Sequence, residues 1–367
     1  MVAPLCYYIT AHGYGHGVRS CDILRALHQA APNLPLYVVT DLPIEFLRNR
    51  LPGVPFELRR QVFDTGMVQL DSVRVDIQET QRQALALMQS RDRLVTQEQA
   101  FLQSIGAGLV VTDIPSIPLE AAARAGVRRA AVGNFGWNWI YADFVDQDPA
   151  WQAVVDVYEA GYAQADLLLR LPFAEPMTVF PRRVDIPVVA APGQPCREKI
   201  AALTGAPIDR HWVLLSFSTL NWDDQALDAV NNLTDYAFFT VHPLAWSRSN
   251  IFPVHREDIG FSDLMASVDV VCTKPGFGVL SDCVVNRIPI VYVDRQDFRE
   301  YAVLEQAVQR YLPYAHVSAA DLYAGHLAPA LAAVRQAAPP TEQVPTNGAP
   351  LAADRLLSLG GITRQNG

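Results

Sequence analysis

The chain has 367 residues, of which half are hydrophobic and 18% are charged, with a formal net charge of −9 and a pI near 5.4. This length and composition predict two globular domains with sizeable cores and exclude an intrinsically disordered protein. The acidic balance argues against nucleic acid as a partner, because binding it needs a basic face. No apolar run approaches the length of a membrane span, and oligomeric state leaves no signal in the sequence.

The cysteines indicate a reducing compartment. There is no CxxC pair that would suggest zinc or a redox centre, and the five scattered residues are Cys6, Cys21, Cys196, Cys272 and Cys283. We therefore expect reduced thiols in a cytoplasmic protein. A strand is expected almost at Met1, without the charged n-region and cleavage site of a signal peptide.

The first part of the chain predicts a strand, a glycine loop and a helix. A β-prone run over residues 5–10 leads into Ala11-His-Gly-Tyr-Gly-His-Gly17, and apolar residues at helical spacing follow over residues 18–30. Residues 36–40 predict the next strand and residues 44–49 a short helix. The irregular stretch 53–84 is either a functional loop or a connector, and both interpretations stay open.

Alternating helices and strands then continue to residue 170. The expected elements are a long amphipathic helix over 81–105, a buried strand over 108–113, a helix over 117–125, a strand over 130–133, a helix over 151–165 and a short strand over 167–170. The aromatic segment Asn134-Phe-Gly-Trp-Asn-Trp-Ile-Tyr141 follows a strand end, which is where open α/β sheets bind ligands.

A proline-rich stretch over residues 172–195 marks the linker between two β/α series. The second series has strands over 213–218, 237–241, 268–272 and 290–293, helices from Val279 to Asn286 and over 301–309, a loop over 338–350 and a final helix over 351–359. We predict an N-terminal Rossmann-like domain over 1–190, a second over 191–345, and a C-terminal helix and tail over 346–367. Two such domains would face a central cleft.

The stretch from Thr273 to Arg295 predicts a parallel βαβ unit with a glycine turn, Gly276 and Gly278, at the start of its helix. Free N–H groups and the helix dipole favour an anion such as phosphate at that end. Asp282 lies where a carboxylate could accept from ribose hydroxyls. Equally, the glycines could make only a tight turn, and Asp282 could complement only the helix dipole.

Several motifs together resemble a known family. His12-Gly-Tyr-Gly-His16, Val111-Thr-Asp113, Val132-Gly-Asn-Phe-Gly-Trp137 and Thr273-Lys-Pro-Gly-Phe-Gly278 are similar to the glycosyltransferase-like N-terminal half of L-arabinokinases. The same holds for Asp64-Thr-Gly-Met-Val-Gln69. The glycine/serine-rich phosphate loop of their kinase half does not occur here. The C-terminal half also resembles the lipid-linked N-acetylglucosaminyltransferases of peptidoglycan synthesis, through Phe261-Ser-Asp-Leu-Met265, Gly278-Val-Leu-Ser-Asp282 and Ile288-Pro-Ile290.

These resemblances imply the GT-B fold, an α/β fold of two Rossmann-like doubly wound domains, with the nucleotide sugar mainly on the C-terminal domain. The implied donor is a UDP-sugar. The residues implied to bind it are Gly15, Lys274, Gly276, Phe277, Gly278, Ser281, Asp282, Gln296 and Asp297. Asp282 stands where such enzymes usually have Glu. Leu264 and Met265 either flank the base or, as the favoured interpretation, belong to the core. No metal site is expected, because no carboxylate pair is suitably spaced and the fold class needs no cofactor.

The resemblance to such transferases implies that a histidine of the N-terminal glycine loop transfers the proton, whereas a lone histidine could also be only a structural hydrogen-bonder. His16 is the first candidate for the general base and His12 the second, because an imidazole is poised near neutral pH. Asp113 is expected either to orient a histidine, to bind acceptor or to cap a helix. Lys274, and less so Arg19, are basic candidates for the leaving phosphate. Asn134, Trp137 and Trp139 are predicted to bind the acceptor, although tryptophans in such places often only pack.

The sequence therefore predicts a glycosyltransferase, hexosyl or N-acetylhexosaminyl, that acts on a nucleotide-diphosphate sugar and a small-molecule acceptor. A nucleotide-sugar epimerase or hydrolase of the same fold is the alternative. A non-catalytic nucleotide-sugar-binding protein is the third hypothesis.

Overall fold

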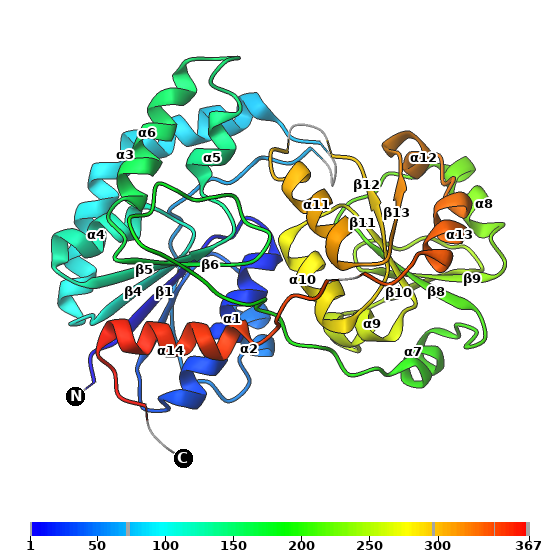
Figure 1. Ribbon diagram of the computed structural model, residues 1–367, viewed down its shortest axis with the longest axis horizontal. Helices are drawn as coiled ribbons and strands as arrows, with labels where there is room; N and C mark the ends of the chain where they lie inside the picture. The colour runs from blue at the N-terminus through cyan, green and yellow to red at the C-terminus, as the bar shows by residue number, and fades with distance from the viewer. Residues whose placement is uncertain (1, 71–73, 296–297, 341, 365–367) are drawn as a thin grey trace. The chain divides into compact units, whose positions relative to one another are not determined.

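The computed structural model describes residues 2–70, 74–295, 298–340 and 342–364. The chain forms two compact units (Figure 1). The first unit comprises Met1–Val68, Asp76–Ala190 and Pro345–Gly367, and the second comprises Gln69–Val75 and Ala191–Val344. Gln296 and Asp297, predicted on the donor side, lie outside the described residues.

The first unit is built on a parallel sheet of seven strands in the order β3-β2-β1-β4-β5-β6-β7. In chain order these strands are β1 (Leu5–Ile9), β2 (Leu36–Val39), β3 (Glu57–Arg59), β4 (Leu109–Asp113), β5 (Arg128–Gly133), β6 (Leu167–Arg170) and β7 (Arg183–Asp185). The order reverses between β1 and β4, so the carboxyl ends of these two strands form the switch point where doubly wound sheets bind ligands.

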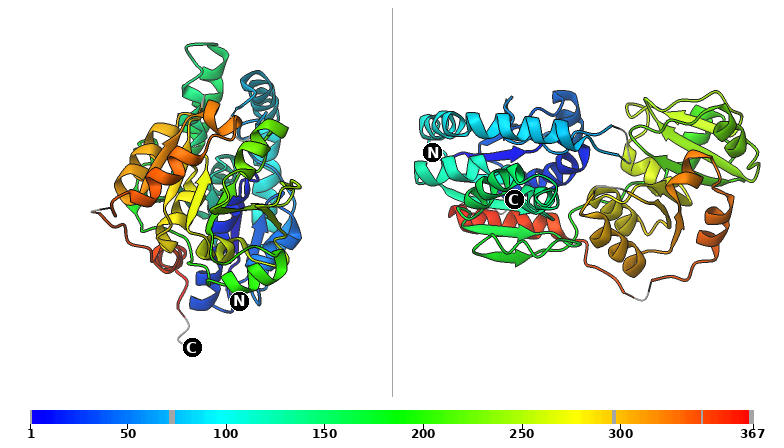
Figure 2. Two further views of the ribbon diagram at one scale, coloured as in Figure 1. Left: turned by 90° about the vertical axis from the view of Figure 1, so that its right-hand side faces the viewer. Right: turned by 90° about the horizontal axis from the view of Figure 1, so that it is seen from above.

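Helices cover both faces of this sheet. They are α1 (Tyr14–Ala30), α2 (Ile44–Arg50), α3 (Ile77–Ser104), α4 (Ile117–Ala125), α5 (Trp137–Ala142), α6 (Ala150–Tyr162) and α14 (Gly348–Gly360). In the right-hand view of Figure 2, α3 in cyan and α14 in red lie on opposite sides of β1. The two-residue period of β1 explains this arrangement, because Leu5, Tyr7 and Ile9 join one core cluster while Cys6 and Tyr8 join the other.

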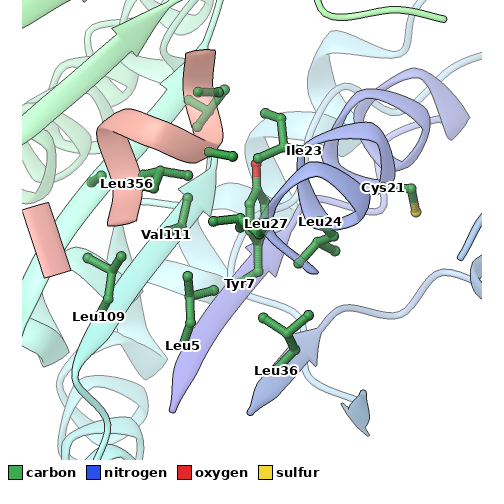
Figure 3. Packing of buried hydrophobic residues seen from close by; sticks show 14 of the residues in the cluster. Leu5, Tyr7, Cys21, Ile23, Leu24, Leu27, Leu36, Leu109, Val111 and Leu356 are labelled. Atoms are coloured by element: carbon green, nitrogen blue, oxygen red, sulfur yellow. The ribbon is translucent and has the colours of Figure 1, made fainter. Parts of the chain in front are cut away.

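The last helix belongs to the first unit although it is last in the chain. Leu356 and Leu357 of α14 are buried with Leu24 and Leu27 of α1, and Figure 3 shows Leu356 beside Val111 of β4. The segment 346–367, expected as a helix and tail, thus contributes to this core. Burying one apolar side chain of this size stabilises the fold by about 1.5–3 kcal/mol.

The second unit repeats the design with a parallel sheet of six strands in the order β10-β9-β8-β11-β12-β13. The strands are β8 (His211–Ser216), β9 (Tyr236–Val241), β10 (Ile251–Val254), β11 (Val270–Thr273), β12 (Ile290–Val293) and β13 (Tyr314–Val317). The helices are α7 (Arg197–Thr204), α8 (Asp224–Asn231), α9 (Phe261–Ser267), α10 (Phe277–Asn286), α11 (Tyr301–Tyr311), α12 (Ala319–Tyr323) and α13 (Ala328–Gln336). Its switch point lies between β8 and β11.

Both helices that follow the glycine loops begin earlier than the apolar spacing predicts. The first begins at Tyr14 rather than Val18, after Gly13 with φ of +82°, and α10 begins at Phe277 rather than Val279. Gly15 and Gly278 therefore lie in the first helical turn and not in the loop. None of the described helices combines the length and the apolar character that a membrane span requires.

Candidate active site

The candidate site of the first unit lies at the carboxyl ends of β1 and β4. His16, Arg19 and Ser20 come from the start of α1, and their spacing of three and four residues places them on one face of that helix. Asp113 is the last residue of β4 and is fully buried. The turn after β1 and the end of the neighbouring strand β4 thus bring residues almost one hundred positions apart into contact.

Asp113 accepts hydrogen bonds from three side chains of α1. Arg19 Nε donates to Oδ2 and Arg19 Nη2 donates to Oδ1, both over 2.6 Å. Ser20 Oγ donates to Oδ2 over 3.0 Å, and His16 Nδ1 lies 2.8 Å from Oδ1. Asp113 does not cap α4, because no side chain caps the start of that helix and its N-cap residue is Ser116. Of the roles predicted for Asp113, the contacts therefore favour orienting a histidine.

The protonation pattern of His16 follows from three distances. Arg19 Nη2 lies 2.9 Å from His16 Nδ1, and both nitrogens lie within 2.8 Å of the same oxygen, Asp113 Oδ1. Arg19 has no acceptor, so the carboxylate oxygen is the acceptor on which both groups converge. We therefore assign the proton of neutral His16 to Nδ1. Nε2 keeps the lone pair, which a general base requires.

Charge and burial shift the pKa values of Asp113 and His16. Burial by itself would raise the pKa of the Asp113 carboxyl, but the charge and hydrogen bonds of Arg19, together with His16, lower the pKa to about 2. Burial and then the charge of Arg19 lower the pKa of His16 below its ordinary value, against the opposite effect of Asp113. At neutral pH the site holds a carboxylate, a guanidinium and a neutral imidazole.

Asn134 joins this network from the end of β5. Arg19 Nη1 donates to Asn134 Oδ1, and Asn134 Nδ2 donates to the carbonyl oxygen of Pro172 over 2.5 Å. Asn134 is only 3% exposed. The contact of Asn134 with an acceptor stays a prediction. The contact that the structure shows is the hydrogen bond from Arg19. Arg19 is likewise buried on Asp113, so the structure does not support the idea that it is a free phosphate ligand.

A second buried carboxylate lies beside this network. Asp64 accepts from Thr10 Oγ1 and from Trp137 Nε1, both over 2.9 Å, with no cation as partner in either contact. Burial raises the pKa of Asp64 to about 6, although these two hydrogen bonds oppose the rise. Sequence reasoning used Asp64 only as part of a motif. A carboxylate in an irregular segment, directly after the apolar pair Val62-Phe63, was the signal for a buried role.

His12 packs against Trp137, the tryptophan that donates to this second carboxylate. His12 Nδ1 accepts from the backbone N–H of Met67 over 3.3 Å, so its neutral form carries the proton on Nε2 and cannot act as a base there. The His12 ring lies edge-on to Trp137, with centroids 5.2 Å apart. Trp137 is 1% exposed and stacks on Tyr141, so in this structure its face is covered by protein. Trp139, which is partly exposed, keeps its predicted acceptor role as a prediction.

The predicted donor residues of the second unit gather at the start of α10. Gly276 is the N-cap residue, no side chain caps the helix, and its first turn holds no acidic residue. Gly276, Phe277 and Gly278 are partly exposed, as is Lys274 just before them. Ser281 Oγ donates back to the carbonyl oxygen of Phe277 over 2.8 Å. The helix end thus carries backbone N–H groups that can bind an anion.

The remaining predictions for the second unit concern Asp282, Leu264 and Met265. Asp282 is buried in the second turn of α10, where its backbone carbonyl accepts from Asn286 Nδ2, and its ribose contact stays a prediction. Leu264 and Met265 are 1% and 0% exposed, which confirms that they are core residues. Among the described residues no group of three or more His, Cys, Asp and Glu side chains is placed to hold a metal ion.

Arg295, which sequence reasoning did not select, lies close to the same loop. Its side chain is 5% exposed, its guanidinium lies 3.0 Å from the centre of the Phe298 ring, and Nη1 lies 3.5 Å from Glu300 and from the carbonyl oxygen of Pro275. Burial lowers the pKa of Arg295 to about 10. The only sequence signal was its place two residues after β12, at the carboxyl edge of the sheet.

The chain is similar to known proteins in sequence and in fold. No family model matches the chain. L-arabinokinase of Arabidopsis thaliana is 28% identical over 345 residues, which cover 89% of this chain and 31% of the relative, so the chain spans about a third of that protein.

Three solved structures are similar over 98% of the chain. They are UGT89C1 of Arabidopsis thaliana (TM-score 0.65, 14% identity, 100% of that chain), the glycotransferase of kitacinnamycin (0.62, 14%, 94%) and Phytolacca americana UGT2 complexed with UDP-2fluoro-glucose and pterostilbene (0.60, 13%, 94%). The chain therefore has the GT-B fold of the glycosyltransferases. Over 89% of the chain, its sequence resembles part of L-arabinokinase.

Proposed function

We propose that this chain is a glycosyltransferase that moves a sugar from a nucleotide-diphosphate sugar, a UDP-sugar, to a hydroxyl group of a small-molecule acceptor. The observation that carries the proposal is the contact between His16 Nδ1 and Asp113 Oδ1, which leaves Nε2 as a base. The GT-B fold supports the reaction class, and the UDP-2fluoro-glucose in the Phytolacca americana relative supports the choice of donor.

In the proposed reaction, His16 Nε2 takes the proton of the acceptor hydroxyl as its oxygen attacks the anomeric carbon of the donor. A new C–O bond forms, and the bond between that carbon and the diphosphate oxygen breaks. The nucleoside diphosphate leaves with the electron pair. Asp113 keeps the ring oriented through Nδ1, which is part of the usual role of a carboxylate behind a catalytic histidine.

The second unit would hold the leaving group. The backbone N–H groups at the start of α10 and the side chain of Lys274 lie at one edge of the sheet, and we expect them to interact with a diphosphate. Arg295 adds a buried positive charge near Pro275 of the same loop. We expect these groups to stabilise the diphosphate without a metal cofactor. Whether the sugar is a hexose or an N-acetylhexosamine is the finer question that donor screening answers.

His16 is preferred over His12 because of the tautomers of the two rings. The backbone N–H of Met67 donates to His12 Nδ1, whereas the carboxylate of Asp113 faces His16 Nδ1.

We also propose that the protein is cytoplasmic, because all five cysteines are free and four of them are buried.

A non-catalytic role is the second candidate. The relative named L-arabinokinase contains this region as only part of its length, so a binding function for the region is a specific alternative. A binding protein would take up a nucleotide sugar and release no nucleoside diphosphate. An epimerase or hydrolase would convert the donor without any acceptor.

The test begins with a thermal-shift screen of nucleotide sugars, followed by measurement of nucleoside diphosphate release with and without acceptors. L-arabinose belongs among the acceptors because of the relative's name. His16→Ala should lower turnover at least ~100-fold and leave UDP binding intact, since Arg19 still neutralises Asp113. His326→Ala, at an exposed histidine of the second unit, is the matched control. Full turnover in His16→Ala would remove His16 from the mechanism.

A further inference from the structure

Arg19 binds the carboxylate of Asp113, whose other two side-chain partners on α1, His16 and Ser20, are neutral. Two of its nitrogens bind the two oxygens of Asp113 over 2.6 Å, in the fork geometry that arginine forms with carboxylates. Arg19 is 7% exposed, and Asn134 holds its remaining terminal nitrogen. The charge of Asp113 is therefore already balanced before His16 takes up a proton.

This balance changes what His16 can do. In a simple His–Asp pair, an unbalanced carboxylate stabilises the imidazolium and makes the histidine a stronger base. Here the imidazolium would form with Nδ1 only 2.9 Å from a guanidinium nitrogen. Like charges at such a distance in a buried site repel one another, so protonation of His16 is opposed.

Within the described part of the chain, the other elements around His16 supply no further charge that is in contact with its ring. The segment after β5 contributes Phe135, whose ring lies edge-on with centroids 5.9 Å apart, and the neutral amide of Asn134. The charge of Asp113 contributes to the raised pKa of Asp64, whereas the pKa of His16 responds to burial, Arg19 and Asp113. Among the described residues, Arg19 on α1 and Asp113 on β4 are thus the charged groups that act on this imidazole.

We propose that Arg19 is a positioning residue that clamps the Asp113 carboxylate and keeps His16 neutral, so that the resting site holds an unprotonated base at neutral and mildly acidic pH. This inference rests on the proposed function for its meaning in catalysis. The electrostatic relation between the three side chains can be measured without any substrate. The lowered pKa of His16 agrees with it.

The test is a titration of His16 by NMR in the intact chain, with the resonance assigned from its loss in His16→Ala. Wild-type His16 should titrate below 6.5 with the neutral proton on Nδ1. Arg19→Gln removes the positive charge but keeps a side chain that can bind Asp113, so the proton affinity of His16 should rise at least ~10-fold. Arg19→Lys keeps a charge and should leave the titration nearer to wild type.

The outcomes distinguish the role of Arg19 from the proposed sugar transfer. A merely structural Arg19 would lower the melting temperature of both variants without moving the titration of His16, which would overturn the proposal. Wild-type His16 titrating at or above 6.5 would do the same, even if Arg19→Gln did not fold. If the chain transfers sugar, the acid limb of its rate profile should move to higher pH in Arg19→Gln. Absence of transfer with every donor would refute the proposed function while the titration still decides the role of Arg19.

Discussion

Replacing Gly66 by alanine tests the packing that joins the loop after β3 to the glycine loop after β1. Gly66 has φ of +63°, and a Cβ built there would lie 2.3 Å from Nδ1 and 2.8 Å from Cβ of His12. The whole His12 side chain would therefore have to move, not only its far end. Its contacts with Met67 and Trp137 would be lost or strained.

The expected magnitude has two parts. An alanine in the left-handed region costs about 1 kcal/mol relative to glycine. Forcing extra volume into a packed site costs about 1–3 kcal/mol more. Gly66→Ala should thus lower the free energy of unfolding by about 2–4 kcal/mol.

Gly53→Ala is the matched control, because Gly53 has φ of +74° and nothing within 4 Å of a built Cβ. It should show the backbone cost alone, about 1 kcal/mol. Chemical denaturation of both variants, followed through the tryptophans, measures the difference. Equal destabilisation of the two variants would refute the close packing of His12 against Gly66.

Three further predictions concern single buried groups. Asp64 has a pKa raised from 3.8 to about 6, so the folded state binds its proton more tightly and stability should fall as pH rises from about 4 to 6, by roughly 3 kcal/mol in all. Asp64→Asn should remove this fall, and parallel pH curves for the two proteins would contradict the assignment. Gly193→Ala would place a Cβ 1.8 Å from the backbone oxygen of Ser262, so we expect the second unit to lose roughly 3 kcal/mol, and a melting curve like wild type would disprove that contact. Asp282→Ala should weaken UDP binding about 10–100-fold, the range for a hydrogen bond to a charged group, and an unchanged calorimetric titration would refute the ribose contact.

The sequence predicted the central strands well and the edge strands poorly. β1, β4 and β11 are runs of apolar residues buried on both faces, so their pattern is continuous and easy to recognise. β3 and β7 are three residues long and partly exposed, and neither was predicted as a strand. Such edge strands form because a neighbouring strand offers hydrogen bonds, and a neighbour is not visible in the local sequence.

The same division holds for the site. His16, Asp113, Asn134 and the start of α10 were predicted from residue type and place, because glycine loops and strand ends mark the ligand-binding edge of an open sheet. The partners were not predicted. Arg19 seemed a weak phosphate ligand, yet it is the residue that binds Asp113. Asp64 seemed part of a loop, yet it is a buried acceptor for Trp137.

By itself, then, the sequence determined two doubly wound units and their glycine loops, since these depend on local spacing and composition. The tertiary structure alone decided the charge balance of the site and the place of α14, which packs on α1 across more than three hundred residues. The reason is physical. Strand order brings Asp113 beside α1, and a hydrogen bond or an apolar contact depends on distance in space, which the order of residues does not contain.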